Sequence, residues 1–258
     1  MKLLDGRDVA DYIKQRHVGQ ARSFDAPPRL AIVREGADEA IDKYIAVKRR
    51  YGADIGVVVD VYAETAETLV DRVRGLGEDD SVAGIIVQLP LAHSELTDAA
   101  LAAVPPAKDV DGLAPGTAFE AATPKAISWL LAAYNVALAG RVIAVVGQGR
   151  LVGAPLSAEL ETSGHTVLRL DEHTSDLATR VRAADIIIAA TGTPGVITSA
   201  MVKPGAVVVD AGSPASELAA DTRERADITI SPNPGGVGPM TVAALFDNLL
   251  IAAQNQRG

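Results

Sequence analysis

The stretch VIAVVGQGRLVG (residues 142–153) joins an apolar run to a glycine-rich turn. The apolar run ends at Val146, and a segment with helical spacing begins at Ala154. Glycines in such a turn let the backbone approach a pyrophosphate, which then sits on N–H groups at the start of the helix. The spacing is G-x-G-x-x-x-G, one residue longer than the usual dinucleotide fingerprint, and a glycine turn alone is often only a turn. The succession of strand, turn and helix favours a nucleotide site.

Asp171 lies at the end of the next expected strand, about 20 residues beyond the glycine turn. A carboxylate at this position can bind a hydroxyl group of an adenosine ribose. The alternative is an ordinary solvated strand end. Asp171 therefore supports the nucleotide interpretation but does not prove it.

Short runs rich in Val and Ile alternate with segments of helical spacing along the chain, which predicts βαβ units and parallel sheets. We expect strands at residues 30–33, 55–61, 84–87, 142–146, 166–170, 185–189, 206–210 and 227–230. We expect helices at residues 7–20, 39–51, 67–76, 95–103, 124–134, 154–161 and 242–253.

Residues 104–116 are dense in Pro and Gly, which indicates a linker. Thr123 and Pro124 then resemble the N-cap and the first residue of a helix. The predicted fold class is α/β, with two doubly wound domains, of which the second is a Rossmann-type nucleotide-binding domain. The first domain would comprise residues 1–120 with a C-terminal helix in 240–258, and the second residues 121–239.

The composition is that of a globular protein and indicates which kinds of partner the chain can have. With 258 residues, 48% hydrophobic and 22% charged, the chain can fold around a sizeable core. Its net charge of −9 disfavours nucleic acid or an anionic membrane as a partner and favours a small molecule. The chain becomes charged too early for a signal peptide, and no apolar run approaches the roughly 18 residues of a membrane helix.

The absence of cysteine excludes disulfides, thiolate metal sites and cysteine nucleophiles, and it is compatible with the cytosol. The four histidines show no metal-ligand spacing. We therefore expect no metal site.

Three polar residues in the first domain are candidates for chemistry. Tyr44 and Lys48 are four residues apart on an expected helix, so they share a face. A lysine below an aromatic ring can act as an acid or base if partial burial lowers its pKa, although the neighbouring cations also fit a plain charged surface. Gln88 follows strand 84–87, at the sheet edge where open α/β proteins bind ligands, or it is a plain strand terminus.

Two loops complete the set of candidates. Asp109 and Asp111 lie between prolines and could cap helices or contact a ligand, while Lys108 could pair with one of them. The segment SPNPGGVGPMT (residues 231–241) holds three prolines and three glycines, which restrict it to one backbone path. We interpret this segment as a loop that lines a ligand.

These motifs, in this order, resemble the bifunctional methylenetetrahydrofolate dehydrogenase/cyclohydrolase family of one-carbon metabolism. The resemblance covers essentially the whole chain. It rests on VQLPL (residues 87–91), KDVDG (residues 108–112), PGGVGPMT (residues 234–241) and the Y-x-x-x-K pattern of Tyr44 and Lys48.

The resemblance implies a role for each candidate residue, in an active site in the cleft between the two domains. Lys48 would be the catalytic lysine, and Gln88 would tune it. Tyr44 would stack on the folate, and Asp111 would hold the pterin ring and belong to the catalytic set. Further substrate contacts are expected at Pro234, Gly235 and Gly236. Cofactor contacts are expected at Gly147, Gln148, Gly149, Arg150, Val152, Gly153, Asp171, Thr191 and Gly192.

The reaction implied is oxidation of 5,10-methylenetetrahydrofolate with a nicotinamide cofactor, followed by hydrolysis to 10-formyltetrahydrofolate, in a cytoplasmic homodimer. The family mostly uses NADP, for whose 2′-phosphate Arg150, Arg169 and His173 are candidate partners. Asp171 favours NAD instead, because a carboxylate binds the free ribose hydroxyl and repels a phosphate.

The chain also departs from the family pattern. Ile41 stands where the family usually has serine, and Ala121-Ala122 stands where it has Pro-Cys. Gln148-Gly149 replaces a frequent Arg-Ser, and residues 170–172 replace Cys-His-Ser. The lysine, glutamine and aspartate are kept, so we expect catalysis to be kept. Two alternatives stay open: a dehydrogenase of another small substrate, and a catalytically degenerate protein that binds folate or nucleotide.

Overall fold

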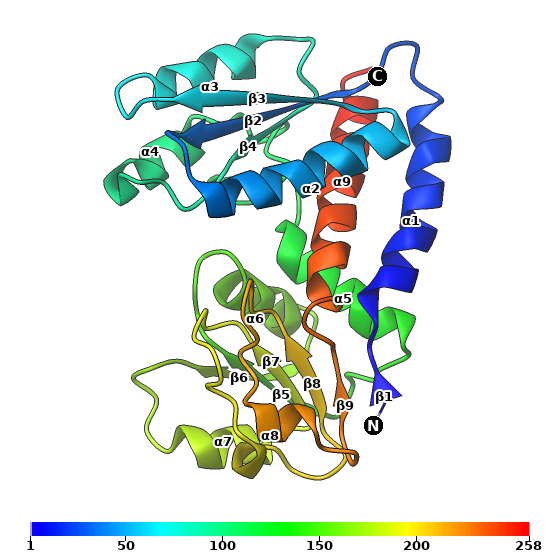
Figure 1. Cartoon of the computed structure of the whole chain (residues 1–258), viewed down its shortest axis with the longest axis vertical. Helices are drawn as coiled ribbons and strands as arrows, with labels where there is room; N and C mark the ends of the chain where they lie inside the picture. Colours follow the sequence, from blue (N-terminus) through cyan, green and yellow to red (C-terminus); the bar gives the residue numbers. More distant parts are fainter. Residues whose placement is uncertain (1, 258) are drawn as a thin grey trace. The chain divides into compact units, whose positions relative to one another are not determined.

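The computed structural model describes residues 2–257, which divide into two compact units (Figure 1). Among the described residues, the three-stranded unit comprises 12–122 and 242–257, and the six-stranded unit comprises 2–11 and 123–241. Each unit is therefore built from two separate stretches of the chain. The boundaries fall inside helices α1 (Gly6–Ala21), α5 (Ala122–Ala133) and α9 (Val237–Asn255).

The three-stranded unit holds a parallel sheet in the order β3-β2-β4. Its strands are β2 (Arg29–Glu35), β3 (Val58–Glu64) and β4 (Gly84–Val87). The helices that follow them are α2 (Glu39–Ile55), α3 (Leu69–Glu78) and α4 (Thr97–Ala102), with a 3-10 turn, η1 (Ser94–Leu96), before α4. Strand β2 is central, and its residues from Leu30 to Glu35 are all buried.

Helices cover both faces of this sheet, as its apolar strands require. On one face, β2 and β4 pack against α3 and α4 in a cluster that includes Val33, Leu69 and Leu101. Elsewhere in the unit, Tyr51 of α2 stacks on Phe246 of α9, with ring centroids 4.8 Å apart. The last helix of the chain therefore completes the core of the three-stranded unit.

The six-stranded unit holds a parallel sheet in the order β1-β9-β8-β7-β5-β6. Its strands are β1 (Lys2–Leu3), β5 (Val142–Val146), β6 (Thr166–Leu170), β7 (Ile186–Ala189), β8 (Val207–Asp210) and β9 (Thr229–Ile230). The remaining helical segments are α6 (Gly153–Thr162), α7 (Leu177–Ala183), η2 (Ser199–Met201) and α8 (Ala220–Arg223). The expected fold class, two doubly wound α/β domains with a Rossmann-type second domain, is confirmed.

Several boundaries differ from the sequence prediction. Strand β3 begins at Val58, because Ile55 is buried as the last residue of α2. Helix α5 begins at Ala122, so Thr123 lies inside the helix and is not its N-cap. Helix α9 begins at Val237 because Pro239 lies in its first turn, where a missing N–H costs no helical hydrogen bond. We expected a loop over residues 231–241, but in the structure the loop ends at residue 236 and residues 237–241 belong to α9.

The N-terminal residues were expected in the first domain, but they join the six-stranded sheet. Strand β1 pairs in parallel with β9, and the N–H of Leu4 donates to Ile230 O at 2.9 Å. Lys2 and Leu3 are both exposed, so β1 has no buried apolar run that a sequence pattern could show.

The expectation that no segment is apolar enough to cross a membrane does not hold for helix α9. By length and composition alone this helix could span a membrane, with a mean hydropathy of 1.3 over its most apolar window. Of that window, 67% is buried inside the structure. The core helix of a globular protein has the same properties.

Asn248 on α9 provides a test of this packing. It is 1% exposed, and its Nδ2 donates to Val110 O (3.0 Å) and Glu120 O (2.9 Å). We predict that Asn248→Ala lowers the free energy of unfolding by about 2–3 kcal/mol, because the buried carbonyl of Val110 loses a donor. Urea denaturation measures this, with Asn255→Ala, exposed at the end of the same helix, as the control. Equal midpoints for the two variants would contradict the prediction.

Candidate functional site

A short hydrogen bond between two candidate residues joins α2 to the segment after β4. Lys48 Nζ donates to Gln88 Oε1 at 2.7 Å. Gln88 is 9% exposed and its Nε2 donates to Leu89 O at 2.9 Å, so the amide oxygen is directed at Lys48. Tyr44, one turn before Lys48 on α2, is 40% exposed. An aromatic ring and a partly buried amine thus share one helix face, as the spacing predicted.

Asp111 reaches the same sheet edge through the segment that precedes it. The N–H of Ile85 in β4 donates to Lys108 O at 2.7 Å, and Ile85 and Asp109 form a parallel bridge. Residues 108–110 therefore extend the edge of the sheet beside β4. Asp111 follows directly, and its backbone oxygen accepts from the N–H of Ala122 at 3.1 Å.

The neighbours of Asp111 have structural partners. Lys108 Nζ donates to Gly77 O (2.9 Å) and Asp79 O (2.8 Å) at the end of α3. The expectation that Lys108 pairs with Asp109 or Asp111 is wrong, because its ammonium donates instead to these two backbone carbonyls at the C-terminal end of α3. Asp109 is 2% exposed and its Oδ2 accepts from the N–H of Ala114 at 2.7 Å. Asp109 shapes the loop, which leaves Asp111 as the candidate for ligand contact.

Burial shifts the pKa values of Lys48 and Asp111, the two ionisable groups of this site, in opposite directions. Burial lowers the pKa of Lys48, and the charge of Asp111 opposes this shift only in part. Burial raises the pKa of Asp111, the charge of Lys48 opposes that rise, and the charge of Asp109 adds to it. Burial thus acts against the charged form of each group, while the opposite charge of the other group acts in its favour. An amine whose pKa is lowered in this way releases its proton more readily than an ordinary lysine does.

In the six-stranded unit, the glycine turn follows β5 and leads into α6. Gly147 has φ +94°, and a Cβ there would lie 2.2 Å from Ala190 O. A Cβ on Gly153 would lie 1.8 Å from Gly147 O, so α6 approaches the turn too closely for any side chain. Gly149, in contrast, has no atom within 4 Å of a Cβ position. The first and third glycines are thus required by packing, and the second leaves open space for a ligand.

The residues of this turn fit a dinucleotide. Gln148 Nε2 donates to Val145 O and Gly147 O, both at 3.1 Å, while its Oε1 is buried without a hydrogen-bond partner among the described residues. This oxygen can accept a hydrogen bond from a bound group. Arg150 is exposed, Val152 is partly buried, and the N-terminus of α6 begins at Gly153, where backbone N–H groups favour an anion.

Asp171 follows β6 and closes its own turn. Its Oδ1 accepts from the N–H of His173 (3.0 Å) and from Thr174 Oγ1 (2.9 Å). Arg169 forms two hydrogen bonds with Glu161, at 2.9 and 2.6 Å, so its guanidinium is already paired. His173 remains exposed at the end of the turn.

Glu217 is a residue that the sequence analysis missed. It is 1% exposed, and it accepts from Thr191 N (2.7 Å), Thr191 Oγ1 (2.8 Å) and Gly192 N (2.8 Å). These hydrogen bonds hold the turn after β7, which touches the glycine turn at Gly147. No local pattern marks Glu217, because its partners are about 25 residues away in the chain.

The Pro- and Gly-rich segment also belongs to the six-stranded unit. The N–H of Ser231 donates to Val208 O at 3.0 Å, and Asn233 Nδ2 donates to Gly212 O at 2.7 Å. Pro234 is exposed, while Gly235 and Gly236 are buried, and Gly235 O accepts from the N–H of Gly6 at 2.8 Å. These three candidates for substrate contact therefore lie in a different unit from Lys48, Gln88 and Asp111.

Ile41, which stands at the position of a family serine, lies on α2 with 7% of its surface exposed. Its backbone N–H donates to Asp38 Oδ1 at 2.9 Å. The apolar side chain contributes to the packing of α2 and supplies no hydrogen-bonding group.

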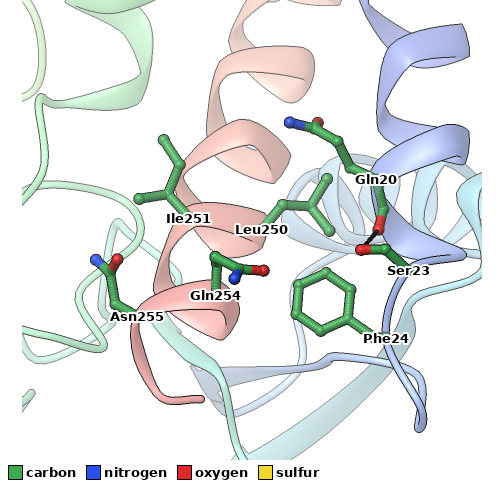
Figure 2. Close-up of a pocket in the computed structure, with 7 residues that line it drawn as sticks. All are labelled: Gln20, Ser23, Phe24, Leu250, Ile251, Gln254 and Asn255. Atoms are coloured by element: carbon green, nitrogen blue, oxygen red, sulfur yellow. Dashed lines mark hydrogen bonds between the residues drawn. The ribbon is translucent and has the colours of Figure 1, made fainter. Parts of the chain in front are cut away.

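One hollow of about 180 Å³ lies away from these candidates, at the end of α9 (Figure 2). Its lining is apolar or neutral: Gln20, Ser23, Phe24, Leu250, Ile251, Gln254 and Asn255. It holds no group that can transfer a proton near neutral pH. Within residues 2–257, no three His, Asp or Glu side chains gather as metal ligands would.

Comparisons with known proteins identify both units. A family model described as tetrahydrofolate dehydrogenase/cyclohydrolase, catalytic domain, matches residues 4–111, and the NAD(P)-binding domain of the same family matches residues 121–257. The chain is 34% identical over 280 residues to the bifunctional protein FolD of Staphylococcus saprophyticus, covering 100% of this chain and 98% of the relative.

Two solved structures extend the comparison. The bifunctional FolD of Campylobacter jejuni is 32% identical, with a TM-score of 0.91 and 99% of each chain covered. The FolD of Trypanosoma brucei, solved with NADP and an inhibitor, is 29% identical, with a TM-score of 0.88 and coverage of 99% of this chain and 98% of that one.

The electrostatics of Lys48 can be measured directly. We predict a pKa of Lys48 below that of the other lysines in an NMR titration of labelled lysine side chains. In Asp111→Asn the pKa falls further, because the charge that stabilises the ammonium form is lost while burial remains. An unchanged or higher pKa in this variant would show that Asp111 does not act on Lys48.

Proposed function

The chain belongs to the tetrahydrofolate dehydrogenase/cyclohydrolase family, and on that basis we propose that the Lys48 site acts on a one-carbon tetrahydrofolate. The activity is oxidation of 5,10-methylenetetrahydrofolate to 5,10-methenyltetrahydrofolate and hydrolysis of that product to 10-formyltetrahydrofolate. The observation that carries the assignment is the 2.7 Å contact of Lys48 with Gln88, at a place where burial lowers the pKa of the amine. Among the described residues, no feature favours another substrate or a degenerate binding protein.

For the oxidation, a bound nicotinamide supplies the chemistry by accepting a hydride from the methylene carbon. The residues of this chain bind and orient. We propose that the carboxylate of Asp111 accepts hydrogen bonds from the ring N–H and the exocyclic amine of the pterin, a charge-assisted pair. We propose that Tyr44 stacks on the folate.

For the hydrolysis, water adds to the methenyl carbon and forms a C–O bond. Lys48, in its neutral form, takes the proton that the water loses. The carbon–N5 bond then breaks, N5 takes a proton from the Lys48 ammonium, and the hydroxyl becomes the formyl carbonyl as its own proton leaves. One proton is released overall, which balances the loss of the methenyl positive charge. Gln88 Oε1 orients the amine through both proton transfers.

The protein uses a nicotinamide dinucleotide, and we propose NADP as the preferred one. The exposed Arg150 beside the glycine turn and the NADP-bound relative from Trypanosoma brucei support this choice. Arg169 does not contribute, because Glu161 already pairs with it. Asp171 favours NAD instead, because a carboxylate facing the ribose would repel the 2′-phosphate of NADP.

We also propose that the protein is a cytoplasmic homodimer without a nucleic-acid or membrane partner. The net charge of −9 and the lack of cysteine support the location and the lack of such partners. Strand β6 at one edge of the six-stranded sheet has backbone groups available for pairing with a second copy.

An absorbance assay with methylenetetrahydrofolate and each nicotinamide in turn tests the activity. We predict that Lys48→Met abolishes hydrolysis of methenyltetrahydrofolate while nicotinamide binding stays intact, because methionine keeps the volume of the side chain and removes the amine. Lys43→Met, on the exposed part of the same helix, is the matched control and leaves the rate unchanged. Normal hydrolysis in the Lys48 variant would refute the role of Lys48.

A second experiment decides the cofactor. If Asp171 faces the ribose, Asp171→Ser strengthens binding of NADP relative to NAD by at least about tenfold, because a charge that repels the 2′-phosphate is gone. Serine keeps an oxygen for the turn to His173. Calorimetric Kd values for both cofactors measure the ratio. An unchanged ratio would mean that Asp171 only closes its turn.

A further inference from the structure

Two consecutive charged residues are buried at the end of the central strand β2. Arg34 is 6% exposed and Glu35 is 7% exposed. Charged side chains are almost never buried to this extent unless they are paired. Because neighbouring residues of a strand point to opposite faces, Arg34 and Glu35 must find their partners on different sides of the sheet.

Arg34 is tied to the helix that carries Lys48. Its guanidinium forms an ion pair with Asp42 of α2, and its Nε donates to Gly36 O at 2.8 Å. Gly36 N–H in turn donates to Glu64 O at the end of β3 (2.9 Å). Arg34 therefore connects the end of the sheet to the first turns of α2, one turn and a half before Lys48.

Glu35 is tied to the segment that carries Gln88. Its Oε2 accepts from the backbone N–H of His93 at 2.9 Å, and its Oε1 contacts His93 Nδ1. At the other end of the segment, Gln88 N–H donates to Val33 O at 2.8 Å, and Leu91 between them is buried. Residues 88–93 are thus attached to β2 at both ends.

We propose that Arg34 and Glu35 are positioning residues for the reaction, which hold α2 and residues 88–93 so that Lys48 Nζ meets Gln88 Oε1. The inference rests on the proposed function. Neither residue needs to touch the substrate, because each acts through the segment it holds. The two ion pairs start from the same end of β2. One holds α2, which carries Lys48, and the other holds residues 88–93, which begin with Gln88.

The Glu35 contact also responds to pH. His93 is half exposed and faces three carboxylates: Glu35 of β2, Glu95 of η1 and Glu67 before α3. The hydrogen bond with Glu35 and the charges around it raise the pKa of His93. The ion pair is therefore complete below the ordinary histidine value and loses its charge as the pH rises through the raised value. The ion pair that holds residues 88–93 to Glu35 therefore weakens as the pH rises above the raised pKa of His93.

Variants of Glu35 test the positioning role through methenyltetrahydrofolate hydrolysis. We expect Glu35→Ala to lower kcat by about tenfold, because small displacements of catalytic groups are costly. We expect KM to change by less than about twofold, since the substrate contacts are kept. Glu35→Gln, which keeps an acceptor for the N–H of His93, recovers most of the rate. Glu95→Gln removes a nearby charge outside the pair and serves as the control, measured below the ordinary histidine pKa, where His93 stays protonated in both proteins.

Variants of His93 test the pH dependence. His93→Lys keeps a cation that does not titrate near neutral pH, so we expect it to remove the part of the alkaline decline that the histidine causes. His93→Leu lowers kcat at every pH. The same pH profile in wild type and His93→Lys would overturn the pH-dependent part of the inference.

A measurement that does not depend on turnover separates this inference from the proposed function. In Glu35→Ala, the pKa of Lys48 from NMR titration should move toward that of an ordinary lysine, because a loosened contact admits water. A folded Glu35→Ala protein with unchanged kcat and unchanged Lys48 pKa would overturn the positioning role. Wild type without hydrolysis would refute the proposed function, while the Lys48 pKa would still decide the positioning role.

Discussion

The hydrogen-bonded pairing of β2 with β3 and β4 is the constraint on which the three-stranded unit depends. Because β2 is central, its register sets the position of both neighbours, from Arg29 opposite Val58 to Val33 opposite Val87. A slip of one residue would turn every side chain of β2 to the other face of the sheet. Arg34 would then face away from α2, and Glu35 away from residues 88–93. The polar contacts of the candidate site therefore depend on the register of this sheet.

The six-stranded unit shows a similar use of buried carboxylates at strand ends. Asp210, at the end of β8, accepts from Gly212 N at 2.9 Å and from Ser216 Oγ at 2.6 Å. Glu217 then holds the turn after β7 through three donors. A buried charge is costly unless its hydrogen bonds are satisfied, and here backbone N–H groups satisfy them. Glu217 thereby fixes the turn that touches the glycine turn at Gly147, and Asp210 fixes the loop that leads to Glu217.

The sequence predicted most of the regular elements of this fold and named the candidate residues of the site, but it predicted neither the short elements β1, α7 and α8 nor the contacts that support the candidates. Strands 84–87 and 142–146 have the predicted bounds, because short runs of Val and Ile between turn residues fit a buried parallel strand best. Strand 166–170 also has the predicted bounds, although it lies at the edge of its sheet and only Leu170 is buried. Lys48, Gln88 and Asp111 stand out through motifs with fixed spacing. Glu35, His93 and Glu217 lie in ordinary local sequence, and only the folded chain brings their partners to them.

The discontinuous make-up of the three-stranded unit has a consequence for synthesis. Residues 12–122 leave the ribosome before residues 123–241 of the other unit, yet Phe246 and Asn248, which pack and hydrogen-bond within the three-stranded unit, follow more than a hundred residues later. Domains generally fold in the order in which they emerge. Here the six-stranded unit is complete at residue 241. Part of the apolar surface of residues 12–122 therefore stays uncovered until α9 has been synthesised. A nascent chain stalled inside α9 would therefore be a natural client for chaperones that bind exposed apolar surface.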